Sequence, residues 1–313
     1  MEASANDTPS IAAGRVGARR SFFTRLGEDK HLRYLLLSPA VLLLLAMTVY
    51  PYIYALRIST YAFRYGKPTV FIGLANYERM LADAFFWESL FRTILFSAGA
   101  VMVELVIGLV LALLANRTRY LRGLIRPGLM LPMSIAPVVV AIIWRLIFNE
   151  EFGVLNFFLD NILGLERLNW LGSLAFFSIF IIDVWQWTPF MFLIILAGLQ
   201  SIPVELFDAA YVDGASEFQL LRYVTLPLLD PTILIAVLVR TVDALRIFDQ
   251  VFLLTQGGPG TQTEFVSLFI YKTAFKFSEV GYASALLLVL FIVTVGMALI
   301  YIRLLRHSAE TGQ

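Results

Sequence analysis

Apolar residues occur along this chain in long continuous runs rather than in short alternating segments. Five runs are almost free of charge and lie at residues 34–56, 93–115, 127–144, 174–200 and 282–302. Each has about the 20 residues that a helix needs to cross the hydrocarbon core of a bilayer. A sixth run, 231–254, is apolar at both ends and carries charged residues between them. The pattern therefore predicts six membrane-spanning helices.

The composition is typical of a chain whose main solvent is lipid. Of the 313 residues, 59% are hydrophobic and 15% are charged, and the mean hydropathy is +0.79. Backbone polar groups in lipid must be paired within their own segment, so continuous apolar runs predict helices and disfavour a β-barrel. The chain has no cysteine, which excludes disulfides and thiolate metal sites.

Neither the histidines nor the net charge indicates a metal or a nucleic acid. His31 and His307 flank the first and last runs, where a wet interfacial side chain is a simpler interpretation than a metal ligand. The formal net charge of +1 does not suggest a nucleic-acid partner. We therefore predict no metal and no cofactor bound by this chain.

The distribution of Lys and Arg between the runs predicts the orientation in the membrane. With the N-terminus inside, thirteen basic residues fall in inside segments and six in outside segments. Both termini are therefore expected on the cytoplasmic side. The basic leader before Tyr34 imitates a signal peptide, but the run that follows is long and lacks a small-residue cleavage site, so it is interpreted as a retained first span. Residues 148–171, outside again, predict a short helix at the outer surface, with Trp170 at headgroup depth.

The segment between the fourth and fifth spans, Gln200 to Asp230, predicts a helix, a turn and a second helix. Pro203 suits a first helical turn, acidic residues favour the positive N-terminal end, and Asp213-Gly214 supplies a left-handed stop, which gives a helix over 203–212.

Ser216 and Gln219 form a capping box for the second helix, 217 to about 224, which Pro227 and Pro231 are expected to close. From these residues alone, an interfacial element without a partner is as good an interpretation as a docking element.

This segment resembles the EAA signature of bacterial ABC-importer permeases. The matching residues are Asp208-Ala209-Ala210, then Gly214, then Val224, then Leu226-Pro227, at the spacing of that signature. The leading Glu of the family is Asp here, and its Ile is Val. Three other stretches, 71–80, 187–190 and 254–259, resemble the carbohydrate-uptake branch, and in particular the larger maltose-type permease. The resemblance covers nearly the whole chain from about Leu35.

The resemblance implies an all-α membrane protein with six transmembrane helices and a cytoplasmic coupling helix between helices 4 and 5, the fold of type I ABC importer permeases. The implied organisation is a cytoplasmic tail at 1–33, a permease domain at 34–305 with a coupling loop at 201–230, and a cytoplasmic tail at 306–313. The implied function is to form, with a second homologous permease in the bacterial inner membrane, the pathway for a sugar or sugar-like solute such as an oligosaccharide, polyol or glycoside.

The resemblance also implies how ATP hydrolysis would be coupled to transport. Helix 203–212 would sit in a groove of a cytoplasmic ATPase dimer, with an extracytoplasmic solute-binding protein on the outer side. Charge, close approach and a sharp turn would come from Glu205, Asp208, Ala209, Ala210 and Gly214. The chain lacks a G-x-x-x-x-G-K-[ST] loop, so it is not itself an enzyme, and ATP and Mg would be bound by the partner ATPase.

Charged residues in the fifth span predict a polar function inside the membrane. Arg240, Asp243, Arg246 and Asp249 recur every three residues, with Gln250 beside the last. Each charge would cost about 2.5–3.5 kcal/mol if it faced lipid, so these side chains must face protein or a cavity. Two interpretations stay open. The last four residues line the solute pathway, or the row is an ion-pair ladder with the partner permease.

The fourth span adds Trp185, Gln186 and Trp187 before Pro189, which is expected to open a helix turn within the membrane. These three side chains are pathway candidates because aromatic faces stack on sugar rings; simple packing of Trp between helices is the alternative. Glu104 in the second span is a further buried charge, whose expected partner is Arg145 or a residue of the sister chain.

Other classes of protein make different predictions. A stand-alone secondary transporter or channel would work without ATP and would show an inverted repeat, which is not found in the sequence. An ABC permease for amino acids, phosphate or peptides would differ only in its solute. A membrane enzyme would need a nucleophile, a base and an orienting group within the apolar spans, and that constellation is missing from the sequence.

Overall fold

The structure is a computed structural model that describes residues 29–117 and 122–311. The chain divides after Tyr54 into two units. The described part of the first unit belongs to helix α2 (Asp29–Ser59). Between Leu36 and Tyr54 its side chains are exposed, apart from the half-buried Ser38, which suits a helix whose surroundings are apolar.

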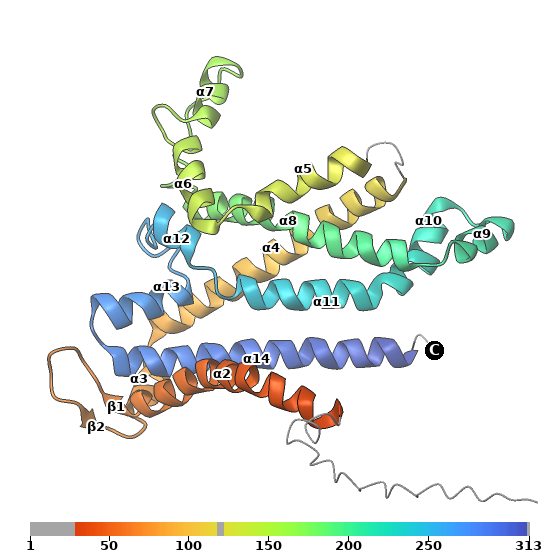
Figure 1. Cartoon of the computed structure of the whole chain (residues 1–313). Coiled ribbons are helices and arrows are strands. Elements are labelled where there is room, and N and C mark those ends of the chain that lie inside the picture. Colours follow the sequence, from red (N-terminus) through yellow and green to blue (C-terminus); the bar gives the residue numbers. More distant parts are fainter. Residues whose placement is uncertain (1–28, 118–121, 312–313) are drawn as a thin grey trace, which may run out of the picture. The chain divides into compact units, whose positions relative to one another are not determined.

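The second unit begins with the last turn of α2 and is almost entirely helical (Figure 1). Its elements in chain order are β1 (Tyr61–Ala62), β2 (Val70–Phe71), α3 (Ala75–Ala82), α4 (Ala84–Arg117), α5 (Arg122–Ser134), α6 (Pro137–Ile147), α7 (Val154–Asn161), α8 (Ala175–Ser201), α9 (Val204–Val212), α10 (Glu217–Leu220), the π-helical turn η1 (Leu221–Thr225), α11 (Leu226–Ala244), α12 (Asp249–Leu254), α13 (Val266–Tyr271), the π-helical turn η2 (Lys272–Lys276) and α14 (Val280–Thr311).

Four helices of the described chain are long and apolar enough to cross a membrane, namely α2, α4, α8 and α14. The pair α5–α6 qualifies together as a fifth candidate, bent by 98°. Helix α11 carries Asp230, Arg240 and Asp243 and does not qualify by composition. The helical class of the prediction is therefore confirmed, and a count of six spans stays a prediction.

The predicted continuous span at 127–144 is wrong, because the helix breaks between Ser134 and Pro137. Proline disfavours the helical conformation of the residue before it, and Ala136 accordingly has φ −58° and ψ 136°. The carbonyl of Ile135, at the break, accepts a hydrogen bond from the side chain of Gln186 on α8 at 3.1 Å. A backbone carbonyl that the helix break leaves without its helical partner is thus hydrogen-bonded by a side chain of a neighbouring helix.

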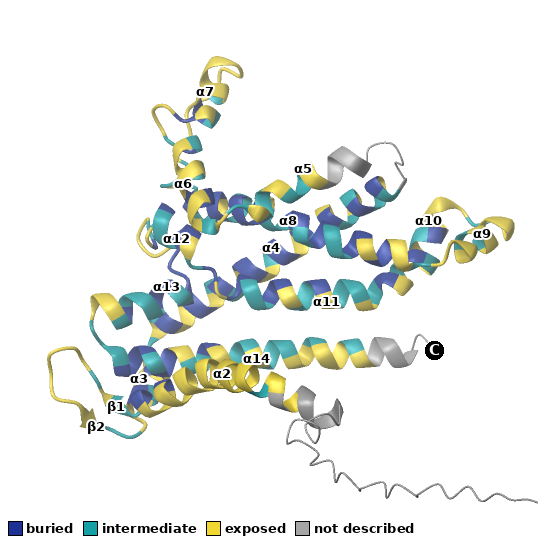
Figure 2. Cartoon of the chain, viewed as in Figure 1, coloured by how far each residue is buried: buried dark blue, intermediate teal, exposed yellow. Residues whose placement is uncertain are grey.

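Two other predictions about helix continuity are also wrong. The run 231–254 is not one helix, because α11 ends at Ala244 and α12 begins at Asp249. Helix α8, in contrast, continues without a break through Pro189. Its kink-prone proline is tolerated in a helix that is more than half buried among its neighbours (Figure 2).

The core forms where α8 packs between α4 and α11. Gly108 of α4 lies so close to α8 that a Cβ there would be 2.7 Å from the Cβ of Met191. Gly198 of α8 lies equally close to α11, where a Cβ would be 2.8 Å from Cγ2 of Thr232. Small residues at both crossings permit this approach of the backbones. The buried apolar side chains around them include Met191, Phe192, Ile195 and Leu229.

Ion pairs and hydrogen bonds hold the β1–β2 hairpin and α3 against the start of α14, at the end of the unit opposite to α9 (Figure 1). Glu279 forms ion pairs with Arg64 and with Arg79, the latter at 2.7 Å. The hydroxyl of Tyr282 donates to Asp83 at 2.6 Å. The backbone N–H of Gly281 donates to the carbonyl of Phe63 at 3.1 Å, so the hairpin is fixed to the helix by main chain as well.

The predicted short helix within 148–171 is confirmed as α7, and one buried amide organises the loop around it. Nδ2 of Asn156 donates to the carbonyls of Asn149 at 3.4 Å, Glu150 at 3.2 Å and Leu168 at 3.0 Å. Its Oδ1 accepts from the backbone of Leu168 at 3.1 Å and from the indole of Trp170 at 3.0 Å. The depth of Trp170 in a membrane stays a prediction.

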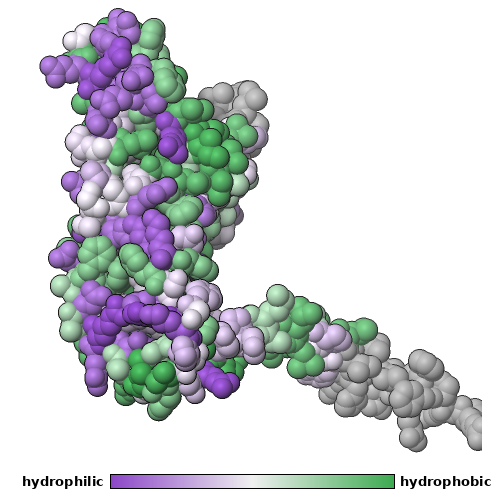
Figure 3. Space-filling view, turned by 90° about the vertical axis from the view of Figure 1, so that its left-hand side faces the viewer, coloured by the Kyte–Doolittle hydropathy of each residue, from purple (hydrophilic) through white to green (hydrophobic). Residues whose placement is uncertain are grey.

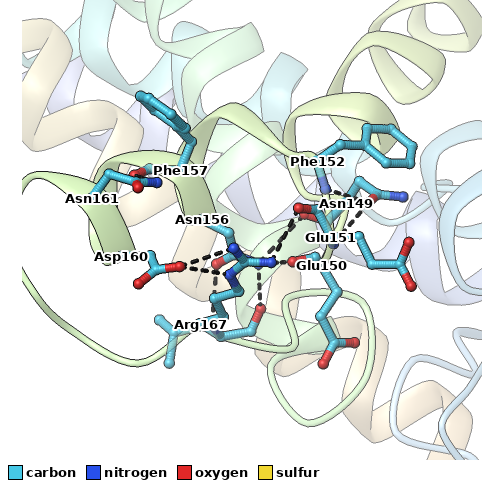
Figure 4. Close-up of polar contacts among 10 residues, drawn as sticks. Asn149, Glu150, Glu151, Phe152, Asn156, Phe157, Asp160, Asn161 and Arg167 are labelled. Carbon is cyan, nitrogen blue, oxygen red and sulfur yellow. Dashed lines mark hydrogen bonds and ion pairs between the residues drawn. The ribbon is translucent and has the colours of Figure 1, made fainter.

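A salt bridge closes the same loop from outside (Figure 4). Arg167 binds Asp160 through Nε and Nη2, both at 2.9 Å, and donates from Nη1 to the carbonyl of Glu151 at 3.2 Å. Polar side chains gather at the end of the molecule that carries α7 (Figure 3), although Phe157 and Phe158 are exposed there.

Candidate solute pathway and coupling loop

A buried ion cluster joins three helices of the second unit. Arg240 of α11 donates from Nε to Oε2 of Glu104 at 2.8 Å and from Nη2 to Oε1 of the same carboxylate at 3.0 Å. Nη2 also binds Asp183 of α8, and Nη1 binds Asp243 at 3.2 Å. The side chains of Arg240 and Glu104 are 1% and 0% exposed. Helices α4, α8 and α11 are therefore connected through one guanidinium.

This cluster corrects the expected partner of Glu104. The sequence suggested Arg145 or a residue of another chain, but Arg145 is exposed on α6 and Glu104 is bound by Arg240. The bidentate geometry matches the fixed fork of the guanidinium, which lysine does not offer. Of the predicted i, i+3 pairs along the charged row, all within the described residues, Arg240 with Asp243 is the one that forms an ion pair.

A cavity of about 100 Å³ opens next to this cluster, at the break between α11 and α12. Its polar lining comprises Asp183, Trp187, Arg240, Asp243, Arg246, Asp249 and Gln250. Five of the seven predicted pathway residues therefore meet at one site. The helix breaks at 245–248, and this break turns Asp249 and Gln250 back towards α8. The break therefore brings the five residues together.

The remaining two pathway candidates lie elsewhere. Gln186 is buried and hydrogen-bonded to the carbonyl of Ile135 and to Nε2 of Gln250, the latter at 2.8 Å. Trp185 is 39% exposed and lines a separate apolar groove between α4, α5 and α8, with its ring 5.5 Å from that of Trp144. The structure thus gives Gln186 a structural contact and separates Trp185 from the cavity.

One face of the Trp187 ring contacts the ion cluster. The Cζ of Arg240 lies 5.2 Å from the centre of the indole ring, within the range of a cation–π contact. The side chain is half-buried, and it lines both the cavity and a second hollow between α8 and α11.

The predicted helix 203–212 is present as α9, and its end has the predicted geometry. Gly214 has φ +77°, the left-handed conformation that favours glycine, and the N–H of Ala215 donates to the carbonyl of Ala210 at 3.0 Å. The residues expected to contact the ATPase lie at the surface, with Glu205, Asp208, Ala209 and Gly214 exposed and Ala210 half-buried.

The helix that follows begins as predicted and ends differently. The capping box of Ser216 and Gln219 is formed in both directions. Pro227 and Pro231 do not close this helix, because α10 continues through the π-helical turn η1 directly into α11. Pro227, which has no N–H to donate, lies directly after the π-helical turn, where the helical hydrogen-bond pattern shifts from i→i−4 to i→i−5. Continuous helical backbone therefore connects Glu217 with Ala244, beside the cavity.

Sequence reasoning missed Asp183 and Arg240 as members of one site. Both were visible as charges inside apolar runs, which is the general signal of a functional or paired group. Their partnership with Glu104 depends on contacts over 57 and 136 positions, which no local pattern contains.

Comparison with known proteins shows the family of this chain. Residues 104–307 match the family described as binding-protein-dependent transport system inner membrane component. The trehalose/maltose transport system permease protein of Thermococcus litoralis is 39% identical over 288 residues, which cover 90% of this chain and 96% of that protein. The chain therefore belongs to this family and is the permease subunit of an ABC importer, a multi-pass membrane protein distinct from the ATPase subunits.

Solved structures have the same fold. A bacterial ABC transporter involved in the import of the acidic polysaccharide alginate superposes with a TM-score of 0.78 at 23% identity, covering 91% of this chain and 98% of that one. The alginate transporter in complex with an alginate pentasaccharide-bound periplasmic protein gives a TM-score of 0.76 at 24% identity, covering 90% and 95%. The type I permease fold is therefore shown.

Proposed function

We propose that this chain carries a sugar or sugar-like solute across a bacterial inner membrane, paired with a homologous permease and driven by a cytoplasmic ATPase dimer. The family membership and the trehalose/maltose name of a relative support a carbohydrate solute. The basic residues of the inside segments support cytoplasmic termini. A periplasmic binding protein in the related alginate complex supports an outer partner of that class.

The observation that carries the proposal is the continuous helical path from Glu217 to Ala244. One end joins the exposed loop of α9, and the other end carries Arg240 and Asp243 at the cavity. The short turn at 213–216 separates α9 from this helix, so a displacement imposed on α9 by closure of the ATPase would reach the cavity mainly through helical backbone. ATP and Mg act on the ATPase and not on this chain.

In this proposal each loop residue has a defined part. Asp208 and Glu205 offer charge to the ATPase groove, Ala209 and Ala210 allow the helix to seat closely, and Gly214 sets the turn that holds α9 in place. At the other end, Trp187, Asp243, Arg246, Asp249 and Gln250 line the solute path. Trp185 and Gln186, which the sequence also suggested, act through packing and hydrogen bonding.

The test is uptake of labelled trehalose into vesicles that contain this chain with its candidate sister permease and ATPase. We expect uptake only with ATP, Mg and the binding protein together. Asp208→Lys should abolish uptake while the assembled complex survives. Glu166→Lys, a charge reversal at an exposed side chain without an ion pair to a described residue, serves as the matched control. Uptake without ATP would overturn the proposal and indicate a secondary transporter. ATP-dependent uptake of amino acids but not of sugars would place the chain in another branch.

A further inference from the structure

One buried acceptor beside the cavity has no hydrogen-bond partner. Nε2 of Gln186 donates to the carbonyl of Ile135, so Oε1 of Gln186 faces Gln250. Nε2 of Gln250 donates to this Oε1 at 2.8 Å. This chain of donors fixes the orientation of both amides. Oε1 of Gln250 is then left without a partner among the described residues, on a side chain that is 3% exposed and lines the cavity. A buried unpaired acceptor is costly, which indicates a donor that arrives from outside the chain.

Two further acceptors at the cavity are accessible, the carboxylates of Asp243 and Asp249. All three nitrogens of Arg240 are occupied by Glu104, Asp183 and Asp243. Asp249 is exposed and has no hydrogen bond or ion pair with a described residue, and the side chain of Asp243 is 46% exposed. Arg246 is the one basic side chain of the lining that is exposed, and its Nε donates to the carbonyl of Val242 at 3.3 Å.

The formal charge of this region is negative. Three carboxylates line the cavity, those of Asp183, Asp243 and Asp249, against the two arginines Arg240 and Arg246, which gives a formal charge of −1. Such an excess disfavours an anion in the cavity, and solvent moderates the effect because the side chains of Asp243 and Asp249 are in part accessible to water. Family membership leaves this property open, since a transporter of the same fold is described as importing an acidic polysaccharide.

We propose that the cavity at the α11–α12 break is a solute subsite for the hydroxyl groups of a neutral sugar or polyol, and that it excludes anionic sugars. Oε1 of Gln250 and the carboxylates of Asp249 and Asp243 accept hydrogen bonds from the hydroxyl groups of the solute. The volume of about 100 Å³ equals roughly three waters of about 30 Å³, so the subsite takes a hydroxymethyl group or one edge of a ring rather than a whole sugar. This assignment rests on the proposed function and names the class of its solute.

The absence of cysteine allows a direct measurement of the charge in this cavity. Phe248 and Ala244 both line it, so Phe248→Cys and, separately, Ala244→Cys each place a single thiol there. The measured quantity is the rate of modification by a cationic methanethiosulfonate divided by the rate for an anionic one. Comparing this ratio with that of a free thiol in solution gives the sign of the local electrostatic potential. We expect a ratio above that of the free thiol, lowered about three- to tenfold by Asp249→Asn and raised similarly by Arg246→Gln. A ratio that favours the anion, or that neither variant changes, would overturn the assignment.

The same thiol tests the solute class without the binding protein. Excess trehalose should slow the modification of the Phe248→Cys thiol in the assembled permease pair, and the mono-uronic acid of trehalose should not. Gln250→Leu should weaken the protection by trehalose. Equal or better protection by the uronic acid would refute the neutral subsite while leaving the transport function intact. Conversely, loss of ATP-driven uptake of every sugar would defeat the proposed function, although the measured potential would still stand.

Discussion

Arg240 on α11 and Glu104 on α4 face each other through two parallel hydrogen bonds, with Nε 2.8 Å from Oε2 and Nη2 3.0 Å from Oε1. Asp183 of α8 binds the same guanidinium, so three helices share one cation. A buried ion pair is often no more stable than an apolar replacement, but removing one partner leaves an uncompensated charge. The cluster therefore specifies how α4, α8 and α11 meet.

Removal of the guanidinium should be the most damaging single change in this region. Arg240→Met leaves two carboxylates buried without a cation, and we expect a loss of stability of about 3–5 kcal/mol. The measurement is the thermal unfolding temperature of the purified chain in detergent, with Arg303→Gln, an exposed arginine on α14, as control. The triple change Arg240→Met, Glu104→Gln and Asp183→Asn should recover part of the loss. An unfolding temperature for Arg240→Met equal to that of the control would contradict the account.

The α4–α8 contact should not tolerate a methyl group. In Gly108→Ala the new Cβ would lie 2.7 Å from the Cβ of Met191 and 3.0 Å from the backbone nitrogen of Phe192, so the helices must separate. We expect a destabilisation of about 1–3 kcal/mol, measured by thermal unfolding.

The matched control for this glycine is Gly296→Ala on α14, where nothing lies within 4 Å of the added carbon. That change should be neutral or stabilising by up to about 1 kcal/mol, because alanine favours a helix. If both variants behaved alike, the close approach of α4 and α8 would not govern stability.

Asn156 should control the order of the α7 loop without controlling global stability. Asn156→Ala removes five hydrogen bonds that connect residues 149–170. We expect faster amide hydrogen exchange throughout that loop and little change in α8 or α14, because loops open as local units. Asn161→Ala removes one hydrogen bond, to Phe157 on the same helix, and should leave the exchange rates unchanged. Uniformly faster exchange across the whole chain would argue against a local role.

The turn at Gly214 should affect coupling through its backbone conformation. At φ +77°, with no heavy atom within 4 Å of an added Cβ, Gly214→Val is strained in the backbone without a steric clash, whereas Gly214→Asn adopts this conformation more readily. We expect Gly214→Val to lower sugar-stimulated ATP hydrolysis by about tenfold or more, as a strain of roughly 1–3 kcal/mol allows, and Gly214→Asn to restore most of it.

The control for this turn is Gly164, which has φ +63° and equally open surroundings in the loop that follows α7. Gly164→Val introduces the same kind of strain away from α9 and should leave coupling intact. If the two valine variants reduced ATP hydrolysis equally, the effect would be one of general folding rather than of the coupling loop.

Sequence patterns predicted the parts of this fold that local chemistry determines. Apolar runs located α2, α4, α8 and α14, and the cap of Ser216 with Gln219 and the stop at Gly214 were identified from residue types. The breaks at 135–136 and 245–248 were not predicted, since a charge or proline within an apolar run does not say whether the helix bends or breaks. Pro189 is accommodated, whereas Pro137 begins a new helix.

The same distinction applies to the candidate site. Charges inside apolar runs correctly indicated a polar region, and Asp243, Arg246, Asp249 and Gln250 do meet. Which acid binds Arg240 depends on how three helices pack, and this information is spread over the whole chain. Trp185 and Trp187 are two positions apart on one helix, so they point to different sides, and only the packing of α8 shows which side faces the cavity.

The amide pair of Gln186 and Gln250 also has a consequence for leakage. Moving α12 away from α8 would break their contact and leave polar groups unpaired where water is scarce, at a cost of about 1–3 kcal/mol for each group. Without a solute to supply hydroxyl groups, the separated arrangement is then about 5 to 150 times rarer for each group lost. In the absence of solute, the contact of α12 with α8 would thus predominate, which would limit leakage of ions at this position between transport cycles.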